Sequence, residues 1–307
     1  MGAVFAAGLM SMAMMIAPAE QVRSPQADGA QTTTALEDIV VQGRRLDEQV
    51  RGFIDEVSAP PVGRGPARWQ DNICVGVANL RGDAAQYLAD RVSEVAMEIG
   101  LEPGEPGCRP NILIIGTDDG SAMARGLVEA RRNVFWPGGA GMSRSRAALE
   151  AFQSNSDPVR WWHISVPVDS QTGSVAVRLP GESAPMVAKT TSGRLRTTIR
   201  NDLNRVIIIV DMARADGLDM RQIADYAAMV AFSQVDPDAD TQGYDSILNL
   251  FRNPQQTPSL SDWDMAYLKA LYGAELNQAS ASHQAGEIQG LMARDQKRAQ
   301  AAVPESD

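Results

Sequence analysis

Three carboxylates stand at the ends of strongly apolar segments, where they could serve acid–base chemistry. Asp118 and Asp119 follow the run NILIIG, and Asp211 ends the run RVIIIVD. Ligand-binding groups of α/β sheets often lie beyond the carboxyl ends of strands, so a hydrolytic site built on these acids is one hypothesis. Short acidic side chains at such positions also cap the helix that follows. We favour capping for Asp118 and Asp119, and we keep all three carboxylates as a possible acidic site.

The two histidines, His163 and His283, belong to no recognisable catalytic or metal motif. A zinc-protease helix needs two histidines four residues apart with a glutamate between them, because this spacing puts both imidazoles on one helix face. His163 stands in the segment WWHIS without a GxSxG motif or a partner serine or cysteine. It is more typical of a structural histidine in a strand. The sequence therefore predicts no catalytic zinc and no cofactor.

The segment RQIADYAAMVAFSQVD, residues 221–236, has the clearest pattern of a buried helix. It offers Asp225 and Tyr226 but no pair of metal ligands, and Asp219 is placed to cap it. Its apolar side chains recur at helical spacing, which favours core packing over chemistry. The expected core face is Ile223, Tyr226, Ala227, Val230 and Ala231.

The loop DPDADTQGYDS, residues 236–246, alternates carboxylates in the manner of a calcium loop. An EF-hand loop needs Gly at its sixth position and Glu at its twelfth, where this chain has Thr241 and Ile247. We favour a solvated loop that caps the next helix through Asp245.

The glycine-rich segment PGGAGMSRS, residues 137–145, could wrap an anion at a helix N-terminus, with Arg144 and Arg146 nearby. It lacks the Lys-Ser/Thr end of a phosphate-binding loop, so a flexible connection is favoured.

The elements that must position these residues alternate between strands and helices. NICVGVANL and NILIIG predict strands, and the helical segment between them has Asp83 as its expected N-cap and Gly100 as its stop. This order permits a right-handed crossover between parallel strands. WWHISVPV and SVAVRLP, around the turn DSQTG, predict a hairpin, and Ser261 with Asp264 resembles a capping box. We expect an α/β or α+β fold, a mixed sheet with packing helices.

Four parts are expected along the chain. Residues 1–19 form a signal peptide that ends in Ala17-Pro18-Ala19. Residues 20–67 form a flexible N-terminal arm that includes a short amphipathic helix and ends in a Pro/Gly linker at 59–67. A single globular domain covers residues 68–278, and residues 279–307 form a polar tail, either a loose helix or disordered.

Charge and cysteine content limit the class of protein. The net charge of −10 and a pI near 4.8 argue against binding of nucleic acid, which needs a basic surface. No segment of the mature chain is expected to span a membrane.

Cys74 and Cys108 stand beside two predicted neighbouring strands, so export to an oxidising compartment would let them form a disulfide. A reduced structural pair is the alternative.

The segment EDIVVQGRR, residues 37–45, resembles the TonB box of outer-membrane receptors. That resemblance implies a flexible arm whose residues Asp38, Ile39, Val40 and Val41 add as a strand to the sheet of the periplasmic protein TonB. Gln42-Gly43 stands where Thr-Gly or Ser-Gly is usual. The chain lacks the series of strands of a receptor barrel, so it is not a TonB-dependent transporter. The alternative is a strand that docks on its own domain.

A second resemblance covers roughly residues 68–292 and rests on the order SILNLF, residues 246–251, then Asp262-Trp263-Asp264, then Leu271-Tyr272. In this order the chain is similar to a secreted bacterial family of unknown function, thought to be related to metzincin metalloproteases. The resemblance implies a metzincin-like architecture, but the zinc ligands are missing here, so no metal site or protease activity carries over. We expect a non-catalytic binding or interaction protein of the periplasm or cell envelope of a Gram-negative bacterium, with TonB or another envelope protein as partner. A hydrolase that uses Asp118, Asp119 or Asp211 is the alternative.

Overall fold

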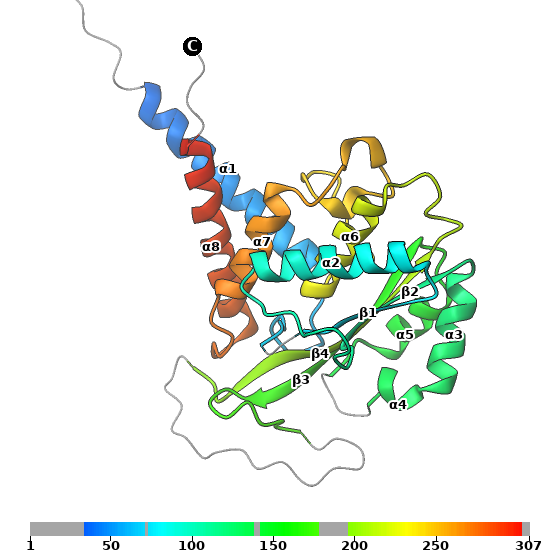
Figure 1. Ribbon diagram of the computed structural model, residues 1–307. Helices are drawn as coiled ribbons and strands as arrows, with labels where there is room; N and C mark the ends of the chain where they lie inside the picture. Colours follow the sequence, from blue (N-terminus) through cyan, green and yellow to red (C-terminus); the bar gives the residue numbers. More distant parts are fainter. Residues whose placement is uncertain (1–33, 71–72, 138–141, 178–195, 303–307) are drawn as a thin grey trace, which may run out of the picture. The chain divides into compact units, whose positions relative to one another are not determined.

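A four-stranded mixed sheet organises the fold (Figure 1). The computed structural model describes residues 34–70, 73–137, 142–177 and 196–302, with side chains from residue 45 onward. Within it, residues 42–307 form one compact unit. The order of strands in the sheet is β1-β2-β4-β3, where β1 is Val75–Ala78, β2 is Ile112–Thr117, β3 is Val159–Asp169 and β4 is Ile199–Asp211.

The first three strands in this order run parallel, and β3 pairs antiparallel with β4. Between β1 and β2 the chain passes through helix α2, Gly82–Glu98, so the expected β–helix–β unit is present. Gly100 has φ +85°, a left-handed conformation that suits glycine after a helix end. Asp83 is not the N-cap of α2, because the helix starts one residue earlier, at Gly82. The predicted mixed sheet with packing helices is confirmed.

Helices cover both faces of the sheet (Figure 1). The helices α1, α2, α6, α7 and α8 contribute to one core cluster, and α3 and α5 contribute to a second. Their bounds are α1 Thr34–Val57, α3 Gly120–Ala130, α4 Arg132–Phe135, α5 Arg146–Ser154, α6 Met220–Phe232, α7 Asp262–Gly273 and α8 Ala281–Ala302, with 3₁₀ turns η1 Ile247–Asn249 and η2 Pro254–Gln256.

Strand β3 is buried along its whole length because both of its faces are covered. The indole of Trp161 donates to Val235 O, just beyond α6, whereas the indole of Trp162 donates to Phe135 O, at the end of α4. Successive side chains of a strand point to opposite faces, which explains this alternation. Side chains of β3 therefore divide into an α6 side and an α3–α5 side.

Helix α6 is the buried helix that the sequence predicts. Residues 222–232 are all buried, including every residue of the predicted core face. Asp219 caps the helix in a capping box with Gln222. Inside it, Asp225 is fully buried and pairs with Arg91 of α2 at 2.6 Å. This helix packs.

The core extends beyond the boundaries expected for the domain. Five apolar residues of α1 are buried in the main cluster, although the domain was expected to begin near Arg68. Phe53, for example, meets the rings of Tyr244, Trp263 and Tyr267 edge-on. At the other end, the segment expected as a polar tail forms α8, which buries Ile288, Met292 and Ala293. The five residues of α1 are Leu46, Val50, Phe53, Ile54 and Val57.

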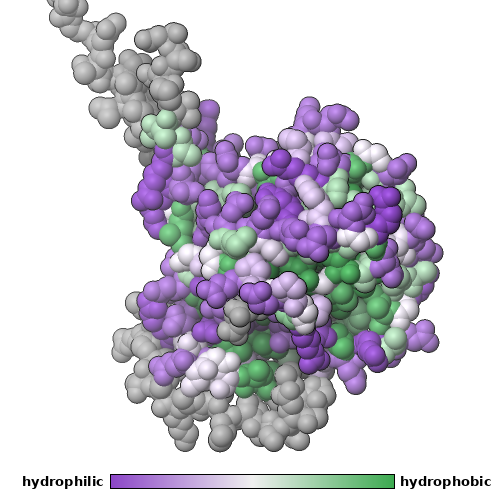
Figure 2. Space-filling view, viewed as in Figure 1, coloured by the Kyte–Doolittle hydropathy of each residue, from purple (hydrophilic) through white to green (hydrophobic). Residues whose placement is uncertain are grey.

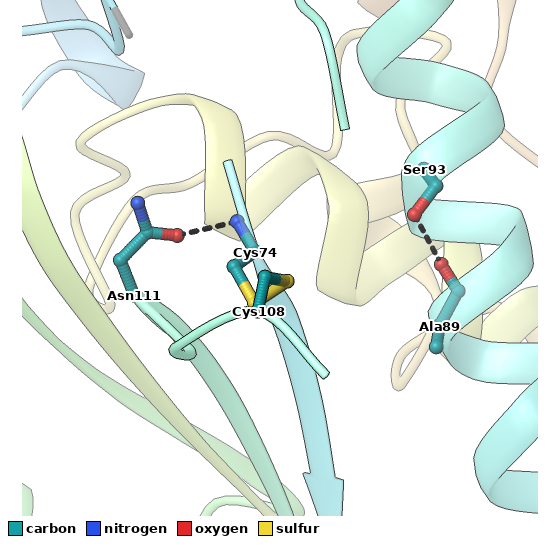
Figure 3. Close-up of a disulfide and its surroundings, with 5 residues drawn as sticks. All are labelled: Cys74, Ala89, Ser93, Cys108 and Asn111. Carbon is teal, nitrogen blue, oxygen red and sulfur yellow. Dashed lines mark hydrogen bonds between the residues drawn. A yellow bond between two sulfur atoms is a disulfide. The ribbon is translucent and has the colours of Figure 1, made fainter. Parts of the chain in front are cut away.

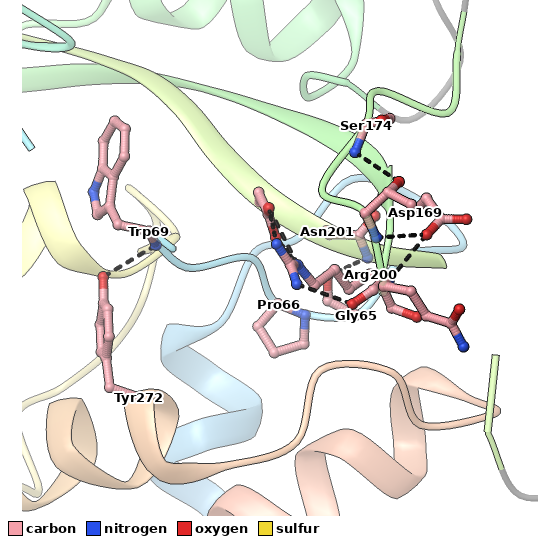
Figure 4. Close-up of polar contacts among 12 residues, drawn as sticks. Gly65, Pro66, Trp69, Asp169, Ser174, Arg200, Asn201 and Tyr272 are labelled. Carbon is pink, nitrogen blue, oxygen red and sulfur yellow. Dashed lines mark hydrogen bonds and ion pairs between the residues drawn. The ribbon is translucent and has the colours of Figure 1, made fainter. Parts of the chain in front are cut away.

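The Pro/Gly segment between α1 and β1 is held by specific hydrogen bonds (Figure 4). The amide of Asn201 donates to Gly65 O at 3.3 Å, and the backbone N–H of Trp69 donates to the phenol oxygen of Tyr272. The buried side chain of Gln284, on α8, donates to Pro66 O at 2.9 Å. These bonds tie the segment to β4, α7 and α8.

The expected hairpin begins at the end of β3. Asp169 N–H donates to Ser174 O at 2.8 Å, and Val168 bridges Val175 in antiparallel fashion. The rest of the expected second strand lies largely outside the described residues, and the long antiparallel partner of β3 is β4.

Cys74 and Cys108 form a disulfide with a Cα–Cα distance of 6.0 Å, as predicted (Figure 3). Asn111 supports the bridge, because its side-chain oxygen accepts the N–H of Cys74 at 2.7 Å. The bond therefore joins the residue before β1 to the loop that precedes β2.

The surface seen in Figure 2 is hydrophilic over α1 and α8, and hydrophobic side chains gather below α2 and beside α3. Partly buried apolar residues packed on the second core cluster include Leu113, Met123 and Leu127. Among the described helices, none has the length and apolar character needed to cross a lipid bilayer.

Candidate functional site

The carboxyl ends of β2 and β4 lie side by side, as the hypothesis of an acidic site requires. Thr117 is in register with Asp211, and Asp118 and Asp119 follow Thr117 directly. Asp119 caps α3, because its Oδ1 accepts the N–H of Ala122 at 2.8 Å. The capping role favoured for this pair therefore belongs to Asp119, and Asp118 is exposed beside it.

Asp211 serves the same helix end from the next strand. Its buried carboxylate accepts the N–H of Gly120 at 3.1 Å and that of Arg214 at 3.3 Å, and the guanidinium of Arg214 lies 3.5 Å away. Negative charge at a helix N-terminus is stabilised by the unpaired N–H groups and the helix dipole. Two of the three predicted carboxylates thus meet at the first turn of α3 and satisfy its backbone.

Arg160 completes this arrangement, and sequence reasoning missed it. Its guanidinium is buried and donates to Phe152 O, Asn155 O and the hydroxyl of Ser121 at 2.9–3.1 Å. A Cβ on Gly120 would lie 3.0 Å from Arg160 Nε, so glycine is needed where α3 begins. Burial lowers the pKa of Arg160, partly offset by Asp157 and Asp211. A charged residue within the apolar run VRWWHIS was the available clue.

His163 lies on the other side of the sheet from this cluster. Its ring is buried, and Nε2 donates to Val230 O in the last turn of α6 at 2.7 Å. Burial lowers the pKa of His163 to about 4, so the ring is neutral at physiological pH. Arg160, three residues earlier in β3, points to the α3–α5 side, where Asp119 and Asp211 also lie, whereas His163 points to α6. The structure therefore does not bring His163 together with Asp119 or Asp211.

We predict that His163 makes stability depend on pH. The unfolded ring binds a proton near pH 6.5, but the folded ring binds one only near pH 4, so stability falls as pH drops through this window. His163→Gln removes the titration and keeps an N–H donor. The difference in unfolding free energy, wild type minus variant, should fall by about 3 kcal/mol between pH 7 and pH 4.

Urea unfolding of both proteins at each pH checks this result. The difference between the two curves is needed because Asp264 acts in the opposite direction, as its pKa is raised to about 6. A difference that stays constant with pH would contradict the structural role given to His163.

Asp264, the buried acidic residue of the predicted capping box, accepts more hydrogen bonds than Asp119 or Asp211. It accepts the hydroxyl of Ser246 at 2.6 Å, the N–H of Ile247 at 2.7 Å, and both the N–H and the hydroxyl of Ser261 at 3.1 and 3.0 Å. Desolvation raises its pKa to about 6 despite these bonds. The predicted capping box of α7 is confirmed, and the same carboxylate also joins the segments SILNLF and SDWD.

The acidic loop before η1 disperses its carboxylates among separate partners. Asp236 pairs with Arg144 at 3.1 Å, and Asp240 pairs with Arg252 at 2.8 Å. The N-cap of η1 is Ser246 and not Asp245, because the Ser246 hydroxyl accepts the N–H of Leu248. Across the described ranges, no group of three His, Cys, Asp or Glu side chains is placed to hold a metal ion.

The glycine-rich segment leads into α5, whose first turn is capped by the hydroxyl of Ser145. Residues 138–141 of this segment lie outside the described residues. Arg144 is engaged by Asp236, whereas Arg146 lies over the ring of Trp136, 5.8 Å from its centre.

A cavity of about 570 Å³ opens between α3, α4 and α5. Arg125, Arg132 and Arg146 each line it from a different helix, together with Trp136. Apart from Arg146, sequence reasoning did not find these residues, because no local motif connects three arginines that the fold gathers. A second cavity, of about 140 Å³, lies beside Asp157, Trp161 and Tyr226.

The chain matches no known protein-family model, and no curated protein or solved structure is significantly similar to it.

Proposed function

We propose that the protein is an exported binding or interaction protein of the cell envelope and does not catalyse a reaction. The observation that carries this proposal is the use of its candidate catalytic groups. Asp119 and Asp211 accept backbone N–H groups of α3, and His163 donates to a backbone carbonyl of α6. A general base must be free to take a proton from a substrate, and these groups are occupied by the fold.

Export is supported by the disulfide between Cys74 and Cys108, since such bonds persist mainly in oxidising compartments. The proposed signal peptide, residues 1–19, lies outside the described residues. The periplasm or envelope of a Gram-negative bacterium remains our proposed location.

TonB or another envelope protein is the proposed partner of residues 38–41. The backbone of these residues is helical, at the start of α1, and not extended as expected. Compact unit 42–307 begins immediately after Val41. Strand addition would therefore require the first turns of α1 to unwind.

The alternative function, an acid-based hydrolase, is favoured by the cavity beside Asp157. Partial burial raises the pKa of Asp157 and full burial raises that of Tyr226, and both residues line this cavity. A raised carboxyl pKa is what a general acid needs. The predicted residues Asp118, Asp119 and Asp211 do not line it, so this site would be built differently from the one expected.

Fractionation of the native cells, followed by intact-mass analysis, tests the proposed function. We expect the protein in the periplasmic fraction, starting at Glu20 and with both cysteines oxidised. The full chain and a chain without residues 20–45 are then compared for binding to the TonB C-terminal domain. A cytoplasmic protein that retains Met1 and two free thiols would overturn export, and equal binding by both chains would exclude the segment 38–41 as the contact.

A further inference from the structure

Three arginines from three helices line one cavity, which we call the arginine groove. Arg125 lies on α3, Arg132 on α4 and Arg146 at the first position of α5, and all three border the cavity of about 570 Å³. This volume falls within the range of sites for small molecules, roughly 300–1,000 Å³. The groove is therefore large enough to enclose a ligand of several functional groups.

The guanidinium groups of the groove keep most of their donors available. Arg125 donates one long hydrogen bond, of 3.4 Å, to Gln153 O. Arg146 lies over the Trp136 ring, a contact that leaves its N–H groups free to bond at the edge of the guanidinium plane. Within the described part of the chain, none of the three forms an ion pair with a carboxylate.

The charge of the groove contrasts with that of the whole chain. The protein carries a net charge of −10, yet the groove brings three positive charges together against two negative ones, from Glu129 and Glu150. Like charges that converge repel one another, and an anion bound between them removes that repulsion. A basic groove in an acidic protein also concentrates anions locally.

We propose that the arginine groove binds a small polyanion that carries two or three phosphate or carboxylate groups. Planar guanidinium groups bind both chemistries through paired hydrogen bonds. The half-buried ring of Trp136 and the side chains of Val128 and Leu149 offer apolar contact to the body of the ligand. This inference rests on the proposed binding function and names its ligand class.

Calorimetric titration of the purified, oxidised protein with inorganic pyrophosphate and with citrate tests the proposal. We expect saturable binding of at least one probe at low salt, and the probe that binds distinguishes phosphate from carboxylate as the preferred chemistry. Binding should quench tryptophan fluorescence, and Trp136→Phe should remove that change. Higher ionic strength should weaken binding.

Three variants distinguish a specific binding site from non-specific electrostatic attraction of anions. Arg132→Gln should weaken binding at least about tenfold, because charge-assisted hydrogen bonds are lost. Arg131→Gln is the matched control, since Arg131 is an exposed neighbour that does not line the groove, and its affinity should stay within about twofold. Glu129→Gln should tighten binding about threefold, because an opposing charge is removed.

Absence of saturable binding of both probes, or equal losses in Arg131→Gln and Arg132→Gln, would overturn the arginine groove as a site. Release of phosphate from pyrophosphate is followed in the same samples. Hydrolysis of pyrophosphate would overturn the proposed non-catalytic function. The affinities of the three variants would still test whether the arginine groove is the binding site. An exported, inactive protein that binds neither probe would overturn the groove alone.

Discussion

Replacement of Asp264 by alanine is expected to lower the free energy of unfolding by about 3–5 kcal/mol at pH 5. The carboxyl group accepts hydrogen bonds from the Ser246 hydroxyl and from the N–H groups of Ile247 and Ser261, and alanine leaves these buried or half-buried donors without that partner. The Ser261 hydroxyl also donates to Asp264, but it keeps Asp245 O as an acceptor. Each unsatisfied buried donor costs about 1–3 kcal/mol. The loss should loosen η1 from the first turn of α7, since Asp264 is the link between them.

The free-energy cost of Asp264→Ala should be smaller at pH 7 than at pH 5, by about 1 kcal/mol. The folded carboxyl binds its proton near pH 6 and the unfolded one near 3.8, so the wild type loses stability as pH rises through this window. Alanine has no proton to release. Denaturant unfolding at pH 5 and 7 measures both effects.

Asp262→Ala provides the matched control for Asp264→Ala. Asp262 is an exposed residue of the same helical turn, and its loss should cost below about 1 kcal/mol through the helix dipole. Equal effects of the two substitutions would contradict the role of Asp264 as a buried link.

Local patterns predicted the parts of the fold in which neighbours in sequence decide the outcome. The strands β1 and β2, the buried helix α6 and its Asp219 cap depend on hydrophobic spacing and on side chains within three residues. The pairing of Cys74 with Cys108 also followed, because the two strands of a β–helix–β unit are adjacent. These features could be inferred from short windows of sequence.

Contributions to the core from the two ends could not be predicted in this way. The helix around Phe53 was recognised as amphipathic, but the surface that it covers comes from residues about 190 to 215 positions later, Tyr244, Trp263 and Tyr267. The C-terminal segment has a low apolar content, and its burial depends on isolated residues such as Ile288 and Met292. Local sequence therefore predicts that both segments lie outside the core.

The location of the candidate site and the capping role of Asp119 were predicted, but the role of Asp211 at the same helix end was not. The carboxyl ends of β2 and β4 do bring Asp119 and Asp211 together, yet both serve the N-terminus of α3. Arg160 reaches the same place from an antiparallel strand, whose position depends on the pairing of β3 with β4. Similarly, the three arginines of the groove come from separate helices. Their grouping is a consequence of tertiary structure.

The residues behind the metzincin-like resemblance are explained by packing. Asp264 joins SILNLF to SDWD, and Arg68 donates to the carbonyls of Leu271 and Tyr272. The Tyr272 hydroxyl in turn donates to Phe232 O, at the end of α6, at 3.1 Å. These contacts hold α7 against its neighbours and join it to the turn η1.

Removal of the disulfide by the double substitution Cys74→Ala/Cys108→Ala is expected to cost about 4 kcal/mol. The bond closes a loop with a sequence separation of 34, which restricts the unfolded chain. It also fixes the start of edge strand β1, whose short ladder pairs on one side with β2 alone.

Denaturant unfolding of the wild type in oxidised and reduced form, beside the double variant, measures this contribution. Reduced wild type should match the variant within about 1 kcal/mol, because both lack the bond, and reductant should leave the variant unchanged. Equal stability of oxidised and reduced wild type would contradict a stabilising bridge. The size of the loss matters for function, since a domain that loses about 4 kcal/mol forfeits a large part of the typical 5–15 kcal/mol of stability. A chain with this dependence folds best in an oxidising compartment, so the same measurement bears on where the protein works.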